Sequence, residues 1–190
     1  MQGAKAEKVH YLDTSALIKN VEEPGSEIID EIYRDAYKGV ERLSFSYWNI
    51  AEAAVVLDKY ERKLGLDARK LLRDMLKESS TLSKLRRLIV VSVSPLILRA
   101  SSKLVPKHHI YVADALQVAS AKSINSCTFV TGDEELVRVA EAEVEYTLCR
   151  RKLSEIEGHQ AVWKEQKRGR AKVLGLAPHT RSVDLPRGNR

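Results

Sequence analysis

The stretch VHYLDTSALIKNV, residues 9–21, decides the fold class of this chain. Its first five residues predict a short strand from Val9 to Asp13, because apolar, aromatic and β-branched side chains favour extended structure. The segment TSALIKNV that follows predicts a helix, and Thr14 or Ser15 is expected to cap its first turn. A strand that ends in an acid and is followed directly by a helix is typical of a parallel α/β sheet, where the acid lies at the carboxyl edge.

A second stretch repeats this order. CTFVTG, residues 127–132, predicts a strand, and Asp133 follows it at the start of the helical pattern DEELVRVA. Two further acids, Glu52 and Asp114, interrupt patterns that otherwise predict apolar helices. Because the carboxyl ends of parallel strands meet at one edge of a sheet, these three acids and Asp13 are expected to converge. Gathered carboxylates repel one another unless a hard cation such as Mg²⁺ or Mn²⁺ neutralises them, so the pattern predicts a metal site.

Strands and helices alternate along the rest of residues 8–150. Further strands are predicted at 42–46, 89–93 and 144–148, and helices at 27–37, 48–64, 95–104, 111–124 and 133–142. Asp67 is expected to cap one more helix, which should loosen around 79–81, and Pro106 is expected to lie in a connection. This alternation predicts a three-layer α/β/α domain with a central, mainly parallel sheet within residues 1–150.

The composition excludes several classes of protein. The chain has 190 residues, of which 44% are hydrophobic and 31% charged, as in ordinary soluble domains. Its longest apolar stretch, at 88–98, is far shorter than the roughly 20 residues of a membrane span. The first residues lack the apolar core of a signal peptide, so we expect a cytoplasmic protein. Two cysteines are too few for a zinc ribbon or a disulfide framework.

Positive charge is concentrated at the end of the chain. Residues 1–150 contain 22 basic and 22 acidic side chains, whereas residues 151–190 contain ten basic and four acidic ones, which accounts for the whole net charge of +6. We therefore treat 151–190 as a basic C-terminal extension that is either disordered or a short helix. The segment KEQKRGRAK at 164–172 is as consistent with contact to a nucleic acid or a protein partner as with a solvating tail.

Four segments carry motifs in a specific order. They are YLDTSALIK at 11–19, SYWNIAEAAVVL at 46–57, HIYVADALQVASA at 109–121 and TGDEELVRVA at 131–140. In motifs, order and approximate spacing the chain resembles the PIN-domain nuclease family, most closely the toxin subunits of VapBC-type toxin–antitoxin pairs. The resemblance covers nearly all of residues 9–148 and does not extend to the basic C-terminal extension.

The resemblance implies a metal-dependent endoribonuclease with Mg²⁺ or Mn²⁺ as cofactor. Its catalytic and metal-binding residues would be Asp13, Glu52, Asp114 and Asp133, with Ser15 and Thr131 as auxiliary hydroxyls that orient carboxylates or water. It also implies an RNA substrate, a cognate antitoxin and a homodimer. Exposed apolar residues such as Ile32 and Tyr33, or Val56 and Tyr60, are candidates for the protein contacts.

Other interpretations of these residues stay open. An acid after a strand is, taken alone, more often a cap than a ligand, and Asp133 would suit the helix that follows it. His108 and His109 are more often solvated than metal-binding, and Tyr47 and Trp48 suit a core as well as a base-stacking role. The alternative functions are an RNA-processing PIN nuclease and a non-catalytic PIN-like module that binds RNA or protein.

Overall fold

Five parallel strands form the centre of the molecule. The computed structural model describes residues 8–18, 26–124, 127–144 and 146–149. The strands are β1 (Lys8–Leu12), β2 (Glu41–Ser46), β3 (Leu88–Val91), β4 (Cys127–Thr131) and β5 (Tyr146–Cys149). Their order in the sheet is β3-β2-β1-β4-β5, and every pairing is parallel. The order reverses at β1, which therefore lies at the centre of the sheet between β2 and β4.

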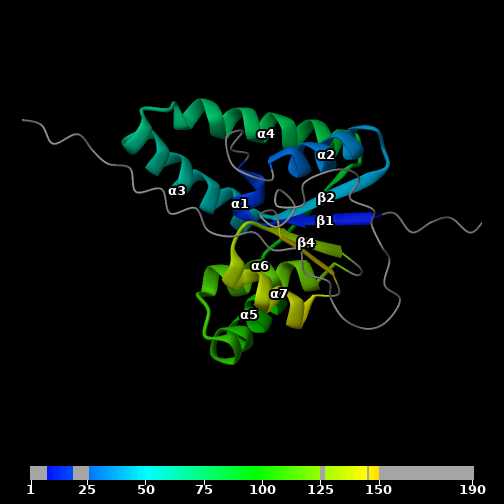
Figure 1. Ribbon diagram of the computed structural model, residues 1–190, viewed down its shortest axis with the longest axis vertical. Coiled ribbons are helices and arrows are strands. Elements are labelled where there is room, and N and C mark those ends of the chain that lie inside the picture. Colours follow the sequence, from blue (N-terminus) through cyan, green and yellow to red (C-terminus); the bar gives the residue numbers. More distant parts are fainter. Residues whose placement is uncertain (1–7, 19–25, 125–126, 145, 150–190) are drawn as a thin grey trace, which may run out of the picture.

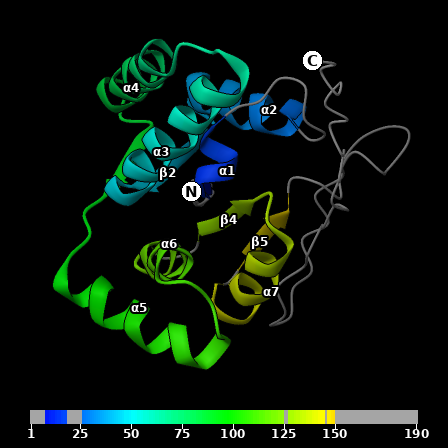
Figure 2. The same cartoon turned by 90° about the vertical axis from the view of Figure 1, so that its left-hand side faces the viewer.

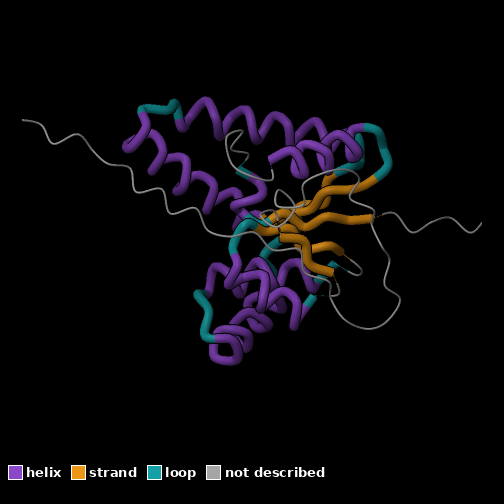
Figure 3. Tube along the Cα trace, in the orientation of Figure 1, coloured by secondary structure: helices purple, strands orange, loops and turns teal. Residues whose placement is uncertain are grey.

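Helices cover both faces of this sheet (Figures 1 and 3). They are α1 (Thr14–Leu17), α2 (Ser26–Tyr37), α3 (Tyr47–Leu64), α4 (Ala68–Lys84), α5 (Pro95–His108), α6 (Val112–Lys122) and α7 (Glu134–Glu143). Helices α1 to α4 lie on one side and α5 to α7 on the other, as the turned view also shows (Figure 2). The predicted α/β/α architecture with a parallel sheet is thus confirmed.

Two hydrophobic cores separate the layers. Because successive strand side chains point to opposite faces, Tyr11 and Phe129 pack against α5, α6 and α7, and their rings stack at 5.7 Å. Their neighbours Leu12 and Val130 pack on the other side, against α1 and α2. Residues 12 and 130 are the last buried apolar positions before the acids and hydroxyls at the carboxyl edge, so the core on the side of α1 and α2 extends up to that edge.

Three sequence predictions about helices were wrong. Helix α4 is continuous through Ser79 and Thr81, whose hydroxyls donate to the backbone oxygens of residues 75 and 77 within the same helix and so do not compete for its N–H groups. Helix α5 continues through Pro106 to His108, although proline has no N–H to donate to the backbone oxygen four residues earlier. Helix α1 is capped by Asp13 rather than by Thr14 or Ser15.

The predicted contact residues on α2 were also misjudged. Ile32 and Tyr33 are 3% and 6% exposed and belong to the core against β2 and α4. They therefore stabilise the monomer and are not available for a dimer or antitoxin contact. On α3, Val56 and Tyr60 are partly exposed.

The basic C-terminal extension and its predicted short helix lie outside the described residues. Among the helices that the structure describes, none is long and apolar enough to cross a bilayer.

Candidate functional site

Asp13 lies directly after β1 and is almost completely buried, at 3% exposure. Its N–H continues the sheet by donating to Val130 O, and its side chain then caps α1 by accepting from Ala16 N at 2.7 Å. Two hydroxyls also donate to the carboxylate, Ser15 Oγ to Oδ1 at 2.7 Å and Thr131 Oγ1 to Oδ2 at 2.6 Å. Burial raises the pKa of Asp13 to about 6, although these three hydrogen bonds favour the charged form.

The two hydroxyls tie β1 to the end of β4. Thr131 Oγ1 donates to Asp13 and accepts from Asp133 N at 3.0 Å, so it connects two of the predicted acids. Ser15 Oγ accepts from Gly132 N at 2.8 Å. A Cβ on Gly132 would lie 3.0 Å from that oxygen, which leaves little room for any side chain at this position. The structure thus places Ser15 and Thr131 against Asp13, as their suggested role requires.

Asp133 does cap a helix. Its Oδ1 accepts from Glu135 N at 2.8 Å and from Leu136 N at 3.2 Å at the start of α7. The side chain is nevertheless exposed, and both cap bonds fall on one oxygen. Capping and a role at the acidic site are therefore compatible, because Oδ2 takes no part in the cap.

Asp114 lies in the first turn of α6 and is half-buried. Its pKa is raised to about 6, first by burial and then by the negative charges of Asp133, Glu52, Asp13 and Glu135, in that order. Coulombic effects of this size require the charges to be near one another. Four acids that are up to 120 positions apart in the sequence thus share one edge of the sheet.

Glu52 is held by two residues to which the sequence analysis gave no role at the acidic site. Its Oε2 accepts from Thr14 Oγ1 at 2.6 Å and from Gln117 Nε2 at 2.8 Å. Gln117 in turn accepts from Asn49 Nδ2 at 2.8 Å, and both amide side chains are buried. In the sequence, the indication was an amide residue one helical turn from an acid. Asn49 precedes Glu52 by one turn, and Gln117 follows Asp114 by one turn.

The four carboxylates offer oxygen donors of the kind that Mg²⁺ and Mn²⁺ prefer. The raised pKa of Asp114 shows that they repel one another, and a divalent cation would relieve that repulsion. The donor chemistry therefore fits such a cation. In the described part of the chain, however, no three histidine, cysteine or acidic side chains are already grouped as a metal site. Asp13 and Glu52 instead accept hydrogen bonds from Thr131 and Gln117.

Comparison with known proteins identifies the fold. Residues 10–142, most of the chain, match the PIN domain. The chain belongs to the PIN domain family. PIN domains are generally nucleases, so a nuclease is the broad function that membership supports. No curated protein matches the chain.

Three solved structures are similar to this PIN domain. PAE2754 from Pyrobaculum aerophilum is 24% identical with a TM-score of 0.52, covering 74% of this chain and 85% of that one. VapBC2 from Rickettsia felis, bound to a DNA fragment from its promoter, is 17% identical with a TM-score of 0.47. FitAcB from Neisseria gonorrhoeae is 19% identical with the same TM-score, and both comparisons cover 69% of this chain and 92% of the other. At 24% identity, the similarity to PAE2754 shows a shared fold and carries no information about function.

The remaining residues singled out from the sequence lie in different surroundings in this PIN domain. His108 pairs with Glu143 at 2.7 Å. Trp48 is half-buried and packs on the core beneath α6, whereas Tyr47 is 58% exposed at the start of α3. The sequence suggested either a core or a base-stacking role for these two aromatic residues, and only Tyr47 remains accessible to a base.

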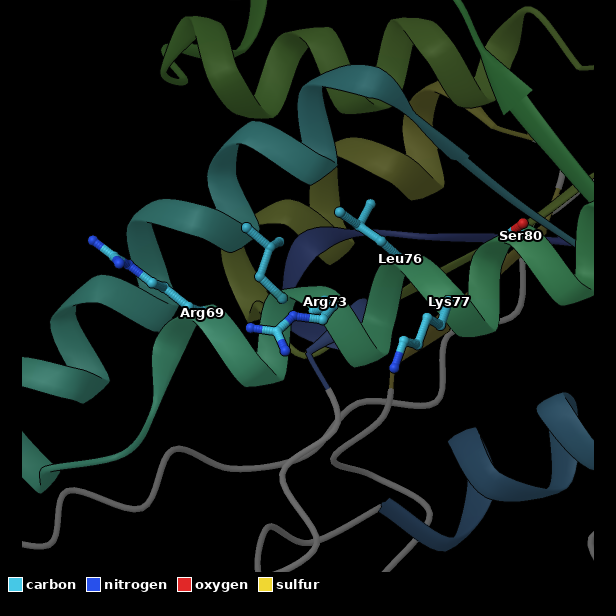
Figure 4. Close-up of a pocket in the computed structure, with 6 residues that line it drawn as sticks. Arg69, Arg73, Leu76, Lys77 and Ser80 are labelled. Carbon is cyan, nitrogen blue, oxygen red and sulfur yellow. The ribbon is translucent and has the colours of Figure 1, made fainter.

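The PIN domain also has a shallow groove of about 520 Å³ along α4. It is lined by Arg69, Leu72, Arg73, Leu76, Lys77 and Ser80. Figure 4 shows the three cationic side chains extending from one face of the helix. None of the four acids lines this groove, so it is separate from the candidate site.

Proposed function

We propose that this PIN domain is a metal-dependent endoribonuclease and the toxin of a toxin–antitoxin pair. The observation that supports a hydrolytic site most directly is the carboxyl edge of the parallel sheet, where Asp13 and Asp133 follow β1 and β4. At this edge burial and the charges of neighbouring acids raise the pKa of Asp114 to about 6. Acids that repel one another at the edge of a sheet destabilise a protein, so their retention calls for a function. Metal-dependent hydrolysis of a phosphodiester is the chemistry that hard oxygen donors at such an edge serve best.

Asp13, Asp114, Asp133 and Glu52 would hold Mg²⁺ or Mn²⁺. When bound, such an ion supplies positive charge for the phosphoryl oxygen and lowers the pKa of its water. The chain itself contributes by holding the metal-binding carboxylate oxygens in fixed positions. Thr131 and Ser15 hold the buried carboxylate of Asp13 in one orientation, and the start of α7 holds Asp133 through one oxygen. Carboxylates that are already held in position need to move less when substrate binds.

RNA, a cognate antitoxin and a homodimer are proposed from the resemblance of the four motifs to VapC-type toxins, and the cytoplasmic location expected from the sequence stays a prediction. Two of the solved structures described above are named as VapBC2 and FitAcB, at identities that carry no weight for the partner. The alternative of a non-catalytic PIN-like module is less well supported, because all four acids are present and lie near one another. An RNA-processing nuclease would share the same site and differ in its substrate.

The test is cleavage of a labelled single-stranded RNA by the full-length protein. We expect cleavage with Mg²⁺ or Mn²⁺, none after chelation, and recovery when either ion is returned. A DNA strand of the same sequence distinguishes a ribonuclease from a general nuclease. Cleavage that persists after exhaustive chelation would exclude the metal mechanism, and binding of RNA without cleavage in any of these ions would favour the binding module.

A further inference from the structure

Gln117 lies on α6 one turn after Asp114 and is 3% exposed. Its side chain joins three elements of the site. It contacts the start of α1 through Thr14, α3 through Asn49, and the carboxylate of Glu52. A buried glutamine needs partners for both ends of its amide, and here one end is directed at an acid.

Two backbone N–H groups set the orientation of these amides, because an N–H can only donate. Ser46 N donates to Asn49 Oδ1 at 2.8 Å, so Asn49 Nδ2 must point away from it, toward Gln117 Oε1 at 2.8 Å. Thr14 N also donates to Gln117 Oε1, at 3.2 Å. The oxygen of Gln117 is therefore fixed on that side, and its Nε2 is left facing Glu52 at 2.8 Å.

The hydroxyl of Thr14 obeys the same constraint. Asn49 Nδ2 and Gln117 Nε2 approach Thr14 Oγ1 at 3.3 and 3.4 Å, as donors. The hydrogen of Thr14 is thus directed at Glu52 Oε2, 2.6 Å away. Both hydrogen bonds to Glu52 fall on Oε2, and Oε1 takes no part in them. The network therefore leads from backbone donors to a single oxygen of one acid.

We propose that Gln117 is a positioning residue that fixes Glu52 so that it presents only Oε1 to the metal or to a water at the acidic edge. Asn49 fixes Gln117, and Thr14 completes the restraint. This inference rests on the proposed function, because it assigns Glu52 a one-oxygen role in that reaction. When a residue that hydrogen-bonds to a metal-binding group is replaced, metal affinity or activity typically falls by about 10- to 100-fold.

The first test is Gln117→Leu in the full-length protein. Loss of the amide frees the Glu52 carboxylate to rotate, so we expect kcat for RNA cleavage to fall by about 10- to 100-fold and KM for RNA to change little. The Kd for Mn²⁺, measured by calorimetry without RNA, should rise over a similar range. Ser101→Ala is the matched control, because it removes the side-chain hydrogen bond of a buried serine on the neighbouring helix α5, to Leu98 O, and contacts none of the acids.

A double-mutant cycle separates positioning from general damage to the fold. If Gln117 acts only through Glu52, then Gln117→Leu should cost less than about twofold in activity when it is added to Glu52→Gln. A structural role would predict the same loss in both backgrounds. Equal losses, or cleavage and Mn²⁺ affinity at the wild-type level in Gln117→Leu, would overturn the proposal.

A measurement on otherwise intact protein covers the case in which Gln117→Leu does not fold. The side-chain ¹⁵N amide resonance of Gln117 should shift on Glu52→Gln and stay in place on Asp74→Asn, a change on the exposed face of α4. A Gln117 side-chain resonance that does not shift on Glu52→Gln would contradict the hydrogen bond on which the proposal depends. If wild-type protein cleaves no RNA, the proposed function fails separately, and this resonance still decides whether Gln117 holds Glu52.

Discussion

Two groups of charged side chains in this PIN domain contrast with each other. At the carboxyl edge of the sheet, Asp13 and Asp114 have pKa values raised to about 6. At the far ends of α5, α6 and α7, Glu143 accepts hydrogen bonds from Lys107 at 2.6 Å, from His108 at 2.7 Å and from Lys122. We call this group the Glu143 cluster. Burial alone would raise the pKa of Glu143, but these three donors hold it down at about 2.

The difference lies in the partners rather than in burial. The side chain of Glu143 is only 4% exposed, comparable to Asp13. Within the described residues, no lysine or arginine forms an ion pair with Asp13, Glu52, Asp114 or Asp133. The Glu143 cluster therefore stabilises the contact between three helices, whereas the acidic edge reduces stability for as long as its charges are not neutralised. This contrast is what a metal site held ready in one place and a structural ion pair in another would produce.

The largest expected effect is on Asp114. Asp114→Asn should lower RNA cleavage by more than about 100-fold, because it removes a charge that holds the metal rather than a residue that merely orients one. In metal-free buffer at pH 7 its melting temperature should equal or exceed that of wild type, since the repulsion among the acids is reduced. Cleavage assays and calorimetric melting measure the two outcomes, with Asp74→Asn as a matched control on α4. A clear loss of melting temperature in Asp114→Asn would show that the residue is structural.

Metal binding should stabilise the protein only through the acids at the carboxyl edge of the sheet. Mn²⁺ at 100 times its Kd should stabilise wild-type protein by about 2.7 kcal/mol, because it binds only the folded state. The same addition should leave Asp114→Asn almost unchanged and should stabilise Glu143→Gln as much as wild type. Ca²⁺ should support cleavage poorly, since its flexible coordination positions a water less strictly. Equal stabilisation of wild type and Asp114→Asn would place the bound ion elsewhere.

Replacing Glu143 should lower stability and leave cleavage unchanged, which is the opposite of the result expected for Asp114→Asn. Glu143→Gln should lower the free energy of unfolding by about 1–2 kcal/mol at pH 7, because Lys107 and Lys122 are largely exposed and screened. The folded pKa is below the ordinary value of 4.5, so this stabilisation is complete above about pH 4.5 and is lost as the pH falls toward 2. Urea unfolding at several pH values should show wild type and variant converging in that window. RNA cleavage should not change, and a loss of cleavage would mean that the cluster also supports the site.

Local patterns in the sequence were sufficient to predict the sheet, its direction and the position of Asp13 and Asp133 directly after two of its strands. Apolar runs ending in acids specify both strand and edge, and such signals are contained within a few residues. Helix ends were less predictable, because a proline in a last turn and two hydroxyls that bond within their own helix depend on details of the backbone. Asp13 as a cap was missed since the same side chain was assigned to the site.

Contacts between distant residues could not be predicted in the same way. Gln117 and Glu52 are 65 positions apart, and Lys107 and Glu143 are 36 apart. Nothing in either helix alone shows that an amide will face an acid or that two lysines and a histidine will surround one. Ile32 and Tyr33 illustrate the same limit, because only the packing of α2 against the sheet decides that they are buried.

The smallest expected effect concerns the source of positive charge for substrate binding. The acidic edge repels phosphates, and residues 1–150 carry no net charge, whereas residues 151–190 carry the excess of six. Replacing Lys167, Arg168 and Arg170 by Gln in the full chain should weaken binding of RNA to Asp114→Asn protein, which binds without cleaving. For each RNA phosphate that the variant no longer neutralises, the slope of log affinity against log salt should become shallower by about 0.7. A Lys107→Gln change should leave that slope alone, because the charge of Lys107 is already paired with Glu143. An unchanged slope in the triple variant would mean that the body of the PIN domain binds the phosphates, and the groove of Arg69, Arg73 and Lys77 would then be the next surface to neutralise.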